Sequence, residues 1–169
     1  MGGTCVASGN VDATRYGFEL EGRYSLNSAL QAYGSIAYVR AQNDTMNVAL
    51  AQTPPLELKL GLDRMLNEWT LGGVVRAVSK QSRVHPNYGS IVGVDRSSST
   101  PSFTTLGINA SYRPTKASQL SFGVDNLLDK NYYEHMSKAD ASISGYSIQT
   151  GTAVNEPGRT FWLKGQVTF

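Results

Sequence analysis

The feature of this 169-residue chain that most constrains its fold is a regular alternation of apolar and polar side chains. In residues 14–26 the even positions are mostly apolar or aromatic, whereas the odd positions carry charged or small groups. Residues 56–63 repeat the pattern, with four leucines separated by Glu, Lys and Gly. A strand sends successive side chains to opposite faces, whereas a helix would spread this pattern around its circumference. Both segments are therefore predicted to be strands with one apolar and one charged face.

Weaker alternation continues along the rest of the chain. It predicts further strands at residues 30–38, 69–77, 106–112, 120–124 and 161–169. No amphipathic helix is indicated between these segments, because the apolar residues do not recur at helical spacing. The fold class predicted is all-β, with about seven antiparallel strands.

The connections between these strands alternate in length. Short turns are predicted near residues 27–29, 67–68 and 115–118, and long connections at the ranges 43–55, 85–102 and 137–158. A soluble sandwich has no reason to place every long connection at one end. Outer-membrane barrels do so, with short turns on the periplasmic side and long loops outside. The alternation in length therefore predicts a transmembrane β-barrel segment.

The charged face supports the same interpretation. Its members are Glu19, Glu21, Arg23, Glu57, Lys59, Asp63, Arg76 and Lys164. A polar lumen with apolar side chains facing lipid accounts for them, as does the solvated outer face of a soluble sheet. Aromatic residues near the strand ends suit the interfacial belts of a membrane protein, and these are Tyr24, Tyr38, Trp69 and Tyr112. A smaller structural or adhesive barrel and a soluble β-sheet protein remain the alternatives.

Composition excludes several other classes of function. The net charge is +2 and no basic block is present, so no nucleic-acid partner is predicted. The single Cys5 rules out an internal disulfide framework. Neither a nucleophile elbow nor a phosphate-binding loop occurs, and an enzyme is not predicted. The first residues lack the pattern of a signal peptide, and no stretch approaches the roughly 20 apolar residues of a membrane helix.

Three segments of the chain resemble TonB-dependent outer-membrane receptors. Residues 121–133, SFGVDNLLDKNYY, resemble the penultimate strand of that family and its exit into the last extracellular loop. Residues 156–169 begin EPGR and resemble the final strand, which ends on a phenylalanine. Residues 16–22, YGFELEG, resemble an earlier strand of the family. Together these segments extend across most of the chain.

Further details resemble the copper-receptor subgroup of that family. They are residues 10–13, 51–57, 133–135 and 155–159. This resemblance implies import of a metal or metal chelate across the bacterial outer membrane, with copper favoured. An iron-siderophore receptor of the same family is the alternative.

Membership of this family would imply a 22-stranded barrel plugged by an N-terminal domain that couples to the TonB complex. Seven strands are an odd number, and bacterial single-chain barrels have an even one. Residues 11–169 are therefore expected to form the C-terminal portion, about the last third, of a larger barrel. Residues 1–10 are expected to be part of an extracellular loop, and the plug is expected to lie outside this chain.

Two groups of residues are candidates for a specific role. His85, His135 and Met136 lie in or beside long connections and are chemically suited to bind copper. The resemblance assigns no copper ligand to this chain, and no resident cofactor is predicted, only a transported copper ion or metal chelate. The second group is the alternating C-terminal segment, with Phe161, Leu163, Val167 and Phe169 on one side. It resembles the signal read by the outer-membrane barrel assembly machinery. This machinery, outer-membrane lipid and the TonB complex are the expected partners.

Overall fold

The computed structural model describes residues 9–86, 88–90, 93–94, 98–137 and 153–168. Cys5, Phe169 and most of the segment 1–10 lie outside the described residues. Seven long strands form one antiparallel sheet in the order β1-β2-β4-β5-β8-β9-β10. Their bounds are β1 Ala13–Asn27, β2 Leu30–Asn43, β4 Glu57–Leu66, β5 Trp69–Val78, β8 Phe103–Thr115, β9 Ser118–Asp125 and β10 Thr160–Val167.

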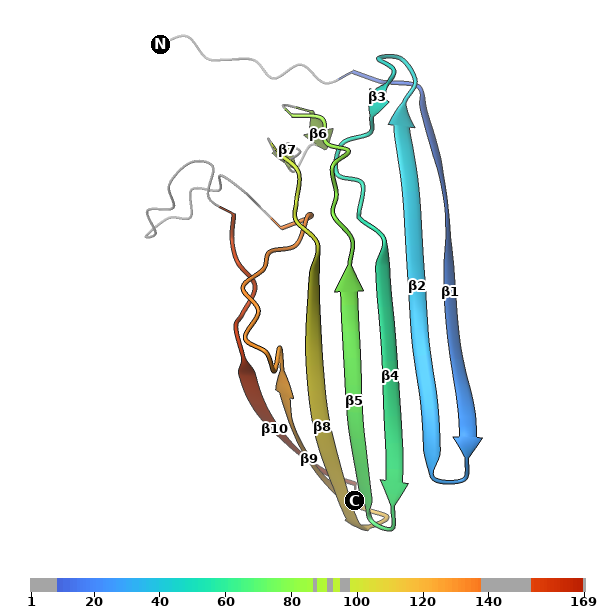
Figure 1. The fold of residues 1–169 in the computed structure, drawn as a ribbon, viewed down its shortest axis with the longest axis vertical. Helices are drawn as coiled ribbons and strands as arrows, with labels where there is room; N and C mark the ends of the chain where they lie inside the picture. The colour runs from blue at the N-terminus through green and yellow to red at the C-terminus, as the bar shows by residue number, and fades with distance from the viewer. Residues whose placement is uncertain (1–8, 87, 91–92, 95–97, 138–152, 169) are drawn as a thin grey trace.

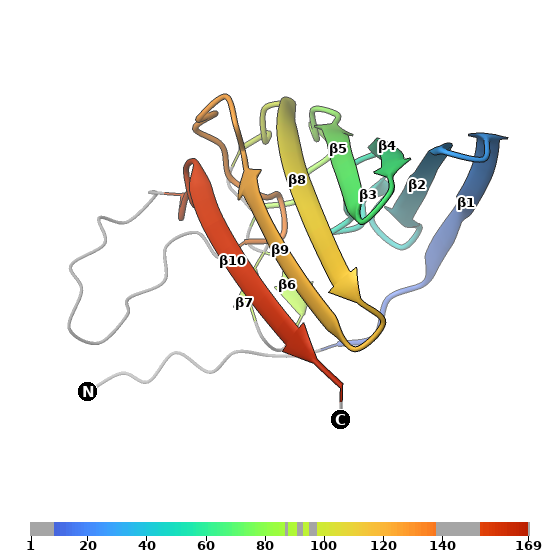
Figure 2. The ribbon, with the colours of Figure 1, turned by 90° about the horizontal axis from the view of Figure 1, so that it is seen from below.

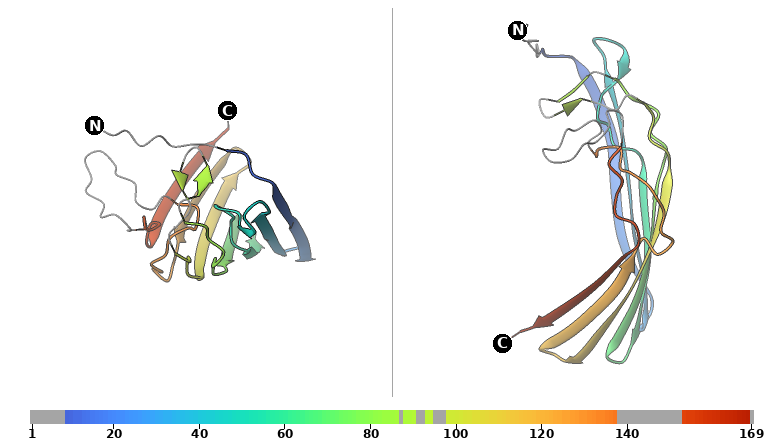
Figure 3. Two further views of the ribbon diagram at one scale, coloured as in Figure 1. Left: turned by 90° about the horizontal axis from the view of Figure 1, so that it is seen from above. Right: turned by 90° about the vertical axis from the view of Figure 1, so that its left-hand side faces the viewer.

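The predicted antiparallel strands and the alternation in connection length are confirmed. Figure 1 shows the short turns at one end of the sheet and the long connections at the other. Three two-residue strands in the long connections were not predicted: β3 Val48–Ala49, which pairs with β2, and the hairpin of β6 Gly89–Ser90 and β7 Gly93–Val94. Figure 3 shows this hairpin displaced to one side of the sheet.

Strand register gives the sheet two chemically different faces. Phe18 pairs with Tyr38, and Leu20 with Ile36, so the apolar positions of neighbouring strands lie side by side. We call this side the apolar face, and its members further along include Leu58, Leu60, Leu71, Val75, Leu106, Ile108, Phe122, Val124, Phe161 and Leu163. We call the other side the polar face, and it carries all the charged residues that alternation predicted there, from Glu19 to Lys164.

Among the residues that the structure describes, no second layer packs against the apolar face. Leu20 is 63% exposed, Leu60 56% and Phe161 74%, and none of the described large side chains is fully buried. A water-soluble protein rarely leaves so large a contiguous apolar surface bare. Figure 2 shows the sheet as an open, curved wall with β1 and β10 at its two edges. No helix among the described residues is long and apolar enough to cross a membrane.

Aromatic side chains lie at the short-turn border of the apolar face and also within it. At the short-turn end, the rings of Trp69 and Tyr112 stack with their centres 4.7 Å apart. Tyr38, predicted at a strand end, instead lies inside β2, where its ring is 5.8 Å from that of Phe18. The apolar positions from Tyr16 to Leu26 span about 33 Å of strand, which a tilt of about 40° reduces to the roughly 25 Å of a membrane barrel's apolar band.

Candidate functional site

The clearest constellation on the polar face lies near the long connections and is centred on Arg76 of β5. Lys59 pairs directly with Arg76 across β4 and β5, which places Glu57 within reach on the same face. The Arg76 guanidinium donates to the carboxylates of Glu57 and Glu134, each at 2.5 Å, and Lys59 Nζ lies 2.8 Å from Glu57. The guanidinium also lies over the ring of Phe103, 5.3 Å from its centre. Because Glu134 belongs to the β9–β10 connection, this ion-pair group fastens that connection to the wall.

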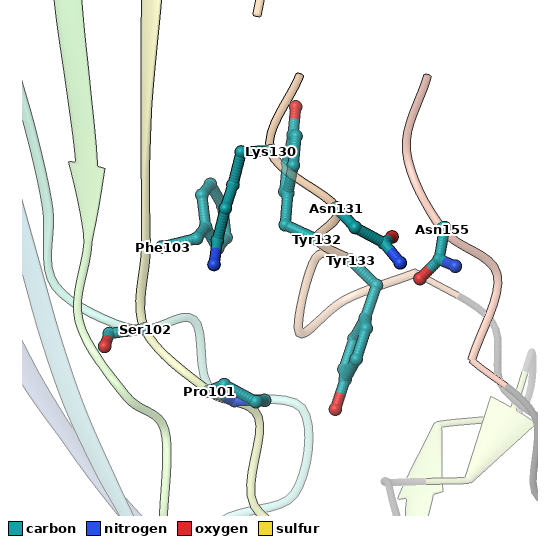
Figure 4. A pocket seen from close by; sticks show the side chains of 8 residues that line it. All are labelled: Pro101, Ser102, Phe103, Lys130, Asn131, Tyr132, Tyr133 and Asn155. Carbon is teal, nitrogen blue, oxygen red and sulfur yellow. The ribbon is translucent and has the colours of Figure 1, made fainter. Parts of the chain in front are cut away.

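An aromatic cavity adjoins the Arg76 group. Phe103 is buried at the start of β8, and its ring centre is 4.2 Å from that of Tyr132. The cavity measures about 230 Å³ and is lined in part by Lys130, Tyr133 and Asn155. Figure 4 shows Tyr132 and Tyr133 pointing in opposite directions from the chain. Burial raises the pKa of the Tyr132 phenol; the Arg76 charge opposes this, and Glu134 adds to it. A phenol and an ammonium group therefore line the same cavity.

A buried chain of hydrogen bonds joins four long-connection segments. Gln81 Nε2 donates to the carbonyl of Thr53 at 2.9 Å, and the backbones of Gln81 and Thr100 bond in both directions. The Thr100 hydroxyl lies 2.8 Å from His135 Nδ1. All four residues are less than a tenth exposed. Buried polar groups need such partners, so the long connections at this end form one connected layer.

The family-like segments of the sequence meet at the exit of β9. Asn126 and Asp129 adopt positive φ angles of 49° and 53°. The Asn126 amide donates to the carbonyls of Lys130 and Pro157, and its oxygen accepts from the Lys130 amide. The Asp129 carboxylate accepts from the Arg159 amide at 2.8 Å. These bonds give Asn126 and Asp129 the turn-shaping role that is typical of Asn and Asp side chains.

The three candidate metal ligands have different surroundings. His135 is buried against Thr100, Met136 is 54% exposed, and His85 stacks on Tyr88 with ring centres 4.1 Å apart. Among the described residues, no group of three or more His, Cys, Asp or Glu side chains could hold a metal ion. Their role as copper ligands stays a prediction.

The strongest features of this end were missed by sequence reasoning. Arg76 and Glu57 were predicted to share a face, but their link to Glu134 crosses 58 residues and has no signal in local spacing. On β10, Phe161, Leu163 and Val167 do lie on one strongly exposed face as predicted, while Phe169 is not described. Their predicted role in assembly remains a prediction.

Comparison with known proteins identifies the family to which this sheet belongs. A family model described as "TonB dependent receptor-like, beta-barrel" matches residues 2–127. No curated protein sequence matches significantly. The chain belongs to the TonB-dependent receptor β-barrel family, as its resemblance implied, and the open, all-antiparallel sheet is a part of such a wall.

Comparison with solved structures shows which members of this family the chain is similar to. The chain is similar to a structure titled "Copper transporter OprC", with 39% identity over 95% of this chain and a TM-score of 0.88. It is also similar to a mutant ferric enterobactin receptor, PfeA, of Pseudomonas aeruginosa (25% identity, 90% of this chain, 22% of that one, TM-score 0.67). The ferric citrate transporter FecA shares the fold at 24% identity over 93% of this chain and 24% of that one, with a TM-score of 0.69. The chain spans only 24% of the length of the copper transporter.

Proposed function

We propose that the protein containing this chain is an outer-membrane receptor that imports a metal ion or metal chelate, with copper as the favoured cargo. The observation that carries this proposal is the 39% identity to the copper transporter OprC along 95% of the chain. The identities to the ferric receptors are near 25% over a similar share of the chain. Import would draw energy from the TonB complex through a plug domain supplied by other residues.

The two faces of the sheet give this proposal its physical basis. The apolar face suits contact with lipid tails, whereas the charged polar face suits a water-filled or plugged lumen. Among the described residues, β1 and β10 each pair with a single neighbouring strand. An open edge leaves backbone groups without partners, which a hydrocarbon environment does not tolerate. Residues 11–169 would therefore form the C-terminal portion of a larger closed barrel.

Import of a ferric siderophore is the second candidate function. The similarity to PfeA favours it, since that protein is a ferric enterobactin receptor. An aromatic cavity with a nearby ammonium group could also contact such a chelate. The two candidate functions differ in the cargo, but both use the same β-sheet wall and the same coupling to the TonB complex.

The cargo is tested by uptake in cells. Under copper limitation, a strain lacking the full-length protein should accumulate several-fold less copper than the parent, and a TonB-deficient strain should show the same defect. Uptake of ferric citrate and ferric enterobactin is measured in parallel. Normal copper content together with reduced uptake of a ferric chelate would reject copper as the cargo and support the import of a ferric siderophore.

Individual metal ligands remain to be assigned. His85, His135 and Met136 are candidates at the loop end, and each is replaced by Ala in the full-length protein before copper uptake is measured. Because His135 is buried, its variant is first checked for heat-modifiable migration, which reports a folded barrel.

We also propose that the β10 segment, ending at Phe169, is read by the barrel assembly machinery through strand addition to an exposed edge. The support is an exposed aromatic and aliphatic row made of Phe161, Leu163 and Val167. Deleting Phe169 from the full-length protein should reduce the heat-modifiable, membrane-inserted form. A Phe169→Tyr variant, which keeps an aromatic ring, serves as the control, and equal insertion of the deletion variant would reject this role.

A further inference from the structure

Three glycines on the polar face of the wall are covered by side chains from neighbouring strands. A Cβ atom at each of these positions would meet side-chain atoms of a strand neighbour at less than 3 Å. The glycines and the residues that cover them are Gly61 under Tyr33, Gly72 under Asp63 and Asn109, and Gly123 under Trp162. Glycine within a strand often marks a place where another group approaches the backbone closely. Here the close approach comes from side chains of the wall itself.

The clearest of these pairs is Tyr33 on Gly61. Tyr33 of β2 is paired with Gly61 of β4, and Ser35 with Lys59, so the ring and the glycine share the polar face with Lys59. A Cβ at Gly61 would lie 2.5 Å from the Tyr33 hydroxyl oxygen, and two carbons at the far end of the ring would be closer still. A strand side chain usually stands roughly perpendicular to the sheet. The Tyr33 ring instead lies down across β4.

Arg23 holds this ring from the other neighbouring strand. Arg23 of β1 is the direct partner of Tyr33, and its guanidinium lies over the ring, 5.5 Å from the ring centre. The Arg23 Nη1 atom also donates to Gln31 Oε1 at 2.9 Å, which fixes the arginine side chain. A guanidinium over an aromatic face is attracted by the π electrons of the ring. Two strand neighbours therefore set the position of Tyr33.

The ring lies near the short-turn end of the wall. Tyr33 is the fourth residue of β2, which begins at Leu30 beside a short turn and ends at Asn43 among the long connections. The distance along the extended strand from Tyr33 to Asn43 is about 34 Å. In an outer-membrane barrel the short turns are on the periplasmic side. A ring that stood up at Tyr33 would therefore narrow the lumen on the side where import ends, far from the long connections.

We propose that Gly61 is a positioning residue for import: it lets Tyr33 lie flat, which keeps the lumen clear on the short-turn side for the movement of the plug and the cargo. A methyl group at Gly61 would occupy the space of the ring, and the ring would have to move away from the sheet, into the lumen. This inference rests on the proposed function for the lumen and for import, and it is independent of the identity of the cargo.

The first test measures whether the ring is the reason for the glycine. It compares the urea-unfolding midpoints, in vesicles, of the full-length protein and its Gly61→Ala, Tyr33→Ala and double variants. Gly61→Ala should lower the midpoint clearly, because the methyl group overlaps the ring. In the Tyr33→Ala background the same substitution should leave the midpoint unchanged. An equal loss in both backgrounds would show that the backbone alone needs the glycine, and would overturn the proposal.

The second test measures TonB-dependent copper uptake by cells. Gly61→Ala should lower the maximal rate several-fold and leave the half-saturating copper concentration unchanged, because cargo would bind at the other end of the wall. Adding Tyr33→Ala should restore the rate. Gly107→Ala is the matched control on the polar face of β8, where the nearest atom to an added Cβ is a Val74 methyl carbon at 3.3 Å and no ring lies above. Equal maximal rates for Gly61→Ala and wild type, or a loss that Tyr33→Ala does not restore, would overturn the proposal.

A further variant keeps the lumen test decisive if Gly61→Ala does not show the heat-modifiable migration of a folded barrel. Ser35 lies on the same face between Glu21 and Lys59, so a ring at this position has no glycine to lie on. Ser35→Tyr should lower the maximal uptake rate, and a normal rate in the folded variant would overturn the proposal. If the wild-type protein imports ferric enterobactin in place of copper, the copper part of the proposed function fails, and the same rates are compared with that chelate.

Discussion

The two ends of the sheet are built from different kinds of contact. At the short-turn end, the side-chain hydrogen bonds are local: the Asn27 side chain accepts from the Ala29 amide, and the Thr115 hydroxyl bonds that of Ser118. At the long-connection end, bonds join distant residues, with Thr53 and Gln81 separated by 28 positions and Thr100 and His135 by 35. The short-turn end is thus held by hydrogen bonds within its turns, whereas the long-connection end is held by contacts between residues far apart in the sequence.

This difference has a functional consequence. Short turns fix the register of each hairpin and need no further role. Long connections carry binding function in many folds because a rigid scaffold positions them. Here the Arg76 ion pairs attach the β9–β10 connection to the wall, and the Gln81 hydrogen bonds join connections to one another, so a change within the connections need not disturb the strands. The following tests compare the wall with the loop end.

The largest effect is expected on the apolar face of the wall. Leu60 lies on β4 between Gly34 and Val75 and is exposed. Leu60→Arg should destabilise the membrane-inserted full-length protein by about 2–4 kcal/mol, because a charge would face hydrocarbon. The neighbouring Lys59→Gln on the polar face is the control. Urea unfolding in vesicles measures both, and equal stabilities would contradict the assignment of the faces.

At the loop end, the most sensitive residue should be Arg76. Arg76→Leu leaves the half-buried carboxylates of Glu57 and Glu134 without their shared cation and should cost about 2–3 kcal/mol. Arg76→Lys should recover only part of this, since an ammonium group cannot bind two carboxylates in one plane. Limited proteolysis of the β9–β10 connection reports the change. Arg113→Leu, at the short-turn end of the same face, should leave that cleavage rate unchanged.

A third test returns to the wall and its close packing. The ring of Trp162 lies against Gly123, its direct partner, and a Cβ there would also lie 2.8 Å from the Ile108 carbonyl oxygen. Gly123→Ala should therefore cost about 1–3 kcal/mol through overpacking. At Gly22, on β1, a Cβ would meet nothing within 4 Å, and Gly22→Ala should be neutral. Thermal unfolding of both variants is measured, and coinciding unfolding midpoints would refute the predicted clash.

The smallest effect is expected at the exit of β9. Asn126→Ala removes three hydrogen bonds to backbone groups at a positive φ and should cost about 1–2 kcal/mol. Asn126→Gly keeps the backbone freedom and isolates the contribution of these bonds. Asn155→Ala, at an exposed position nearby, is the reference. Amide hydrogen exchange at residues 127–130 should rise in both Asn126 variants, and unchanged protection would show that the turn forms without this side chain.

The sequence by itself determined the seven long strands, their two faces and the alternation of short and long connections. These follow from the period of two in the side chains and from turn residues close together in the chain, and both are local properties. It also identified the family, because segments such as residues 121–133 carry a specific pattern that survives without a structure.

Only the tertiary structure showed how the loop end is assembled. Glu134 meets Arg76 across 58 positions, Arg159 meets Asp129 across 30, and His135 meets Thr100 across 35. Such pairs depend on where irregular connections fold back over the wall. Periodicity contains no information about this, because these connections have no repeating pattern that would fix their path.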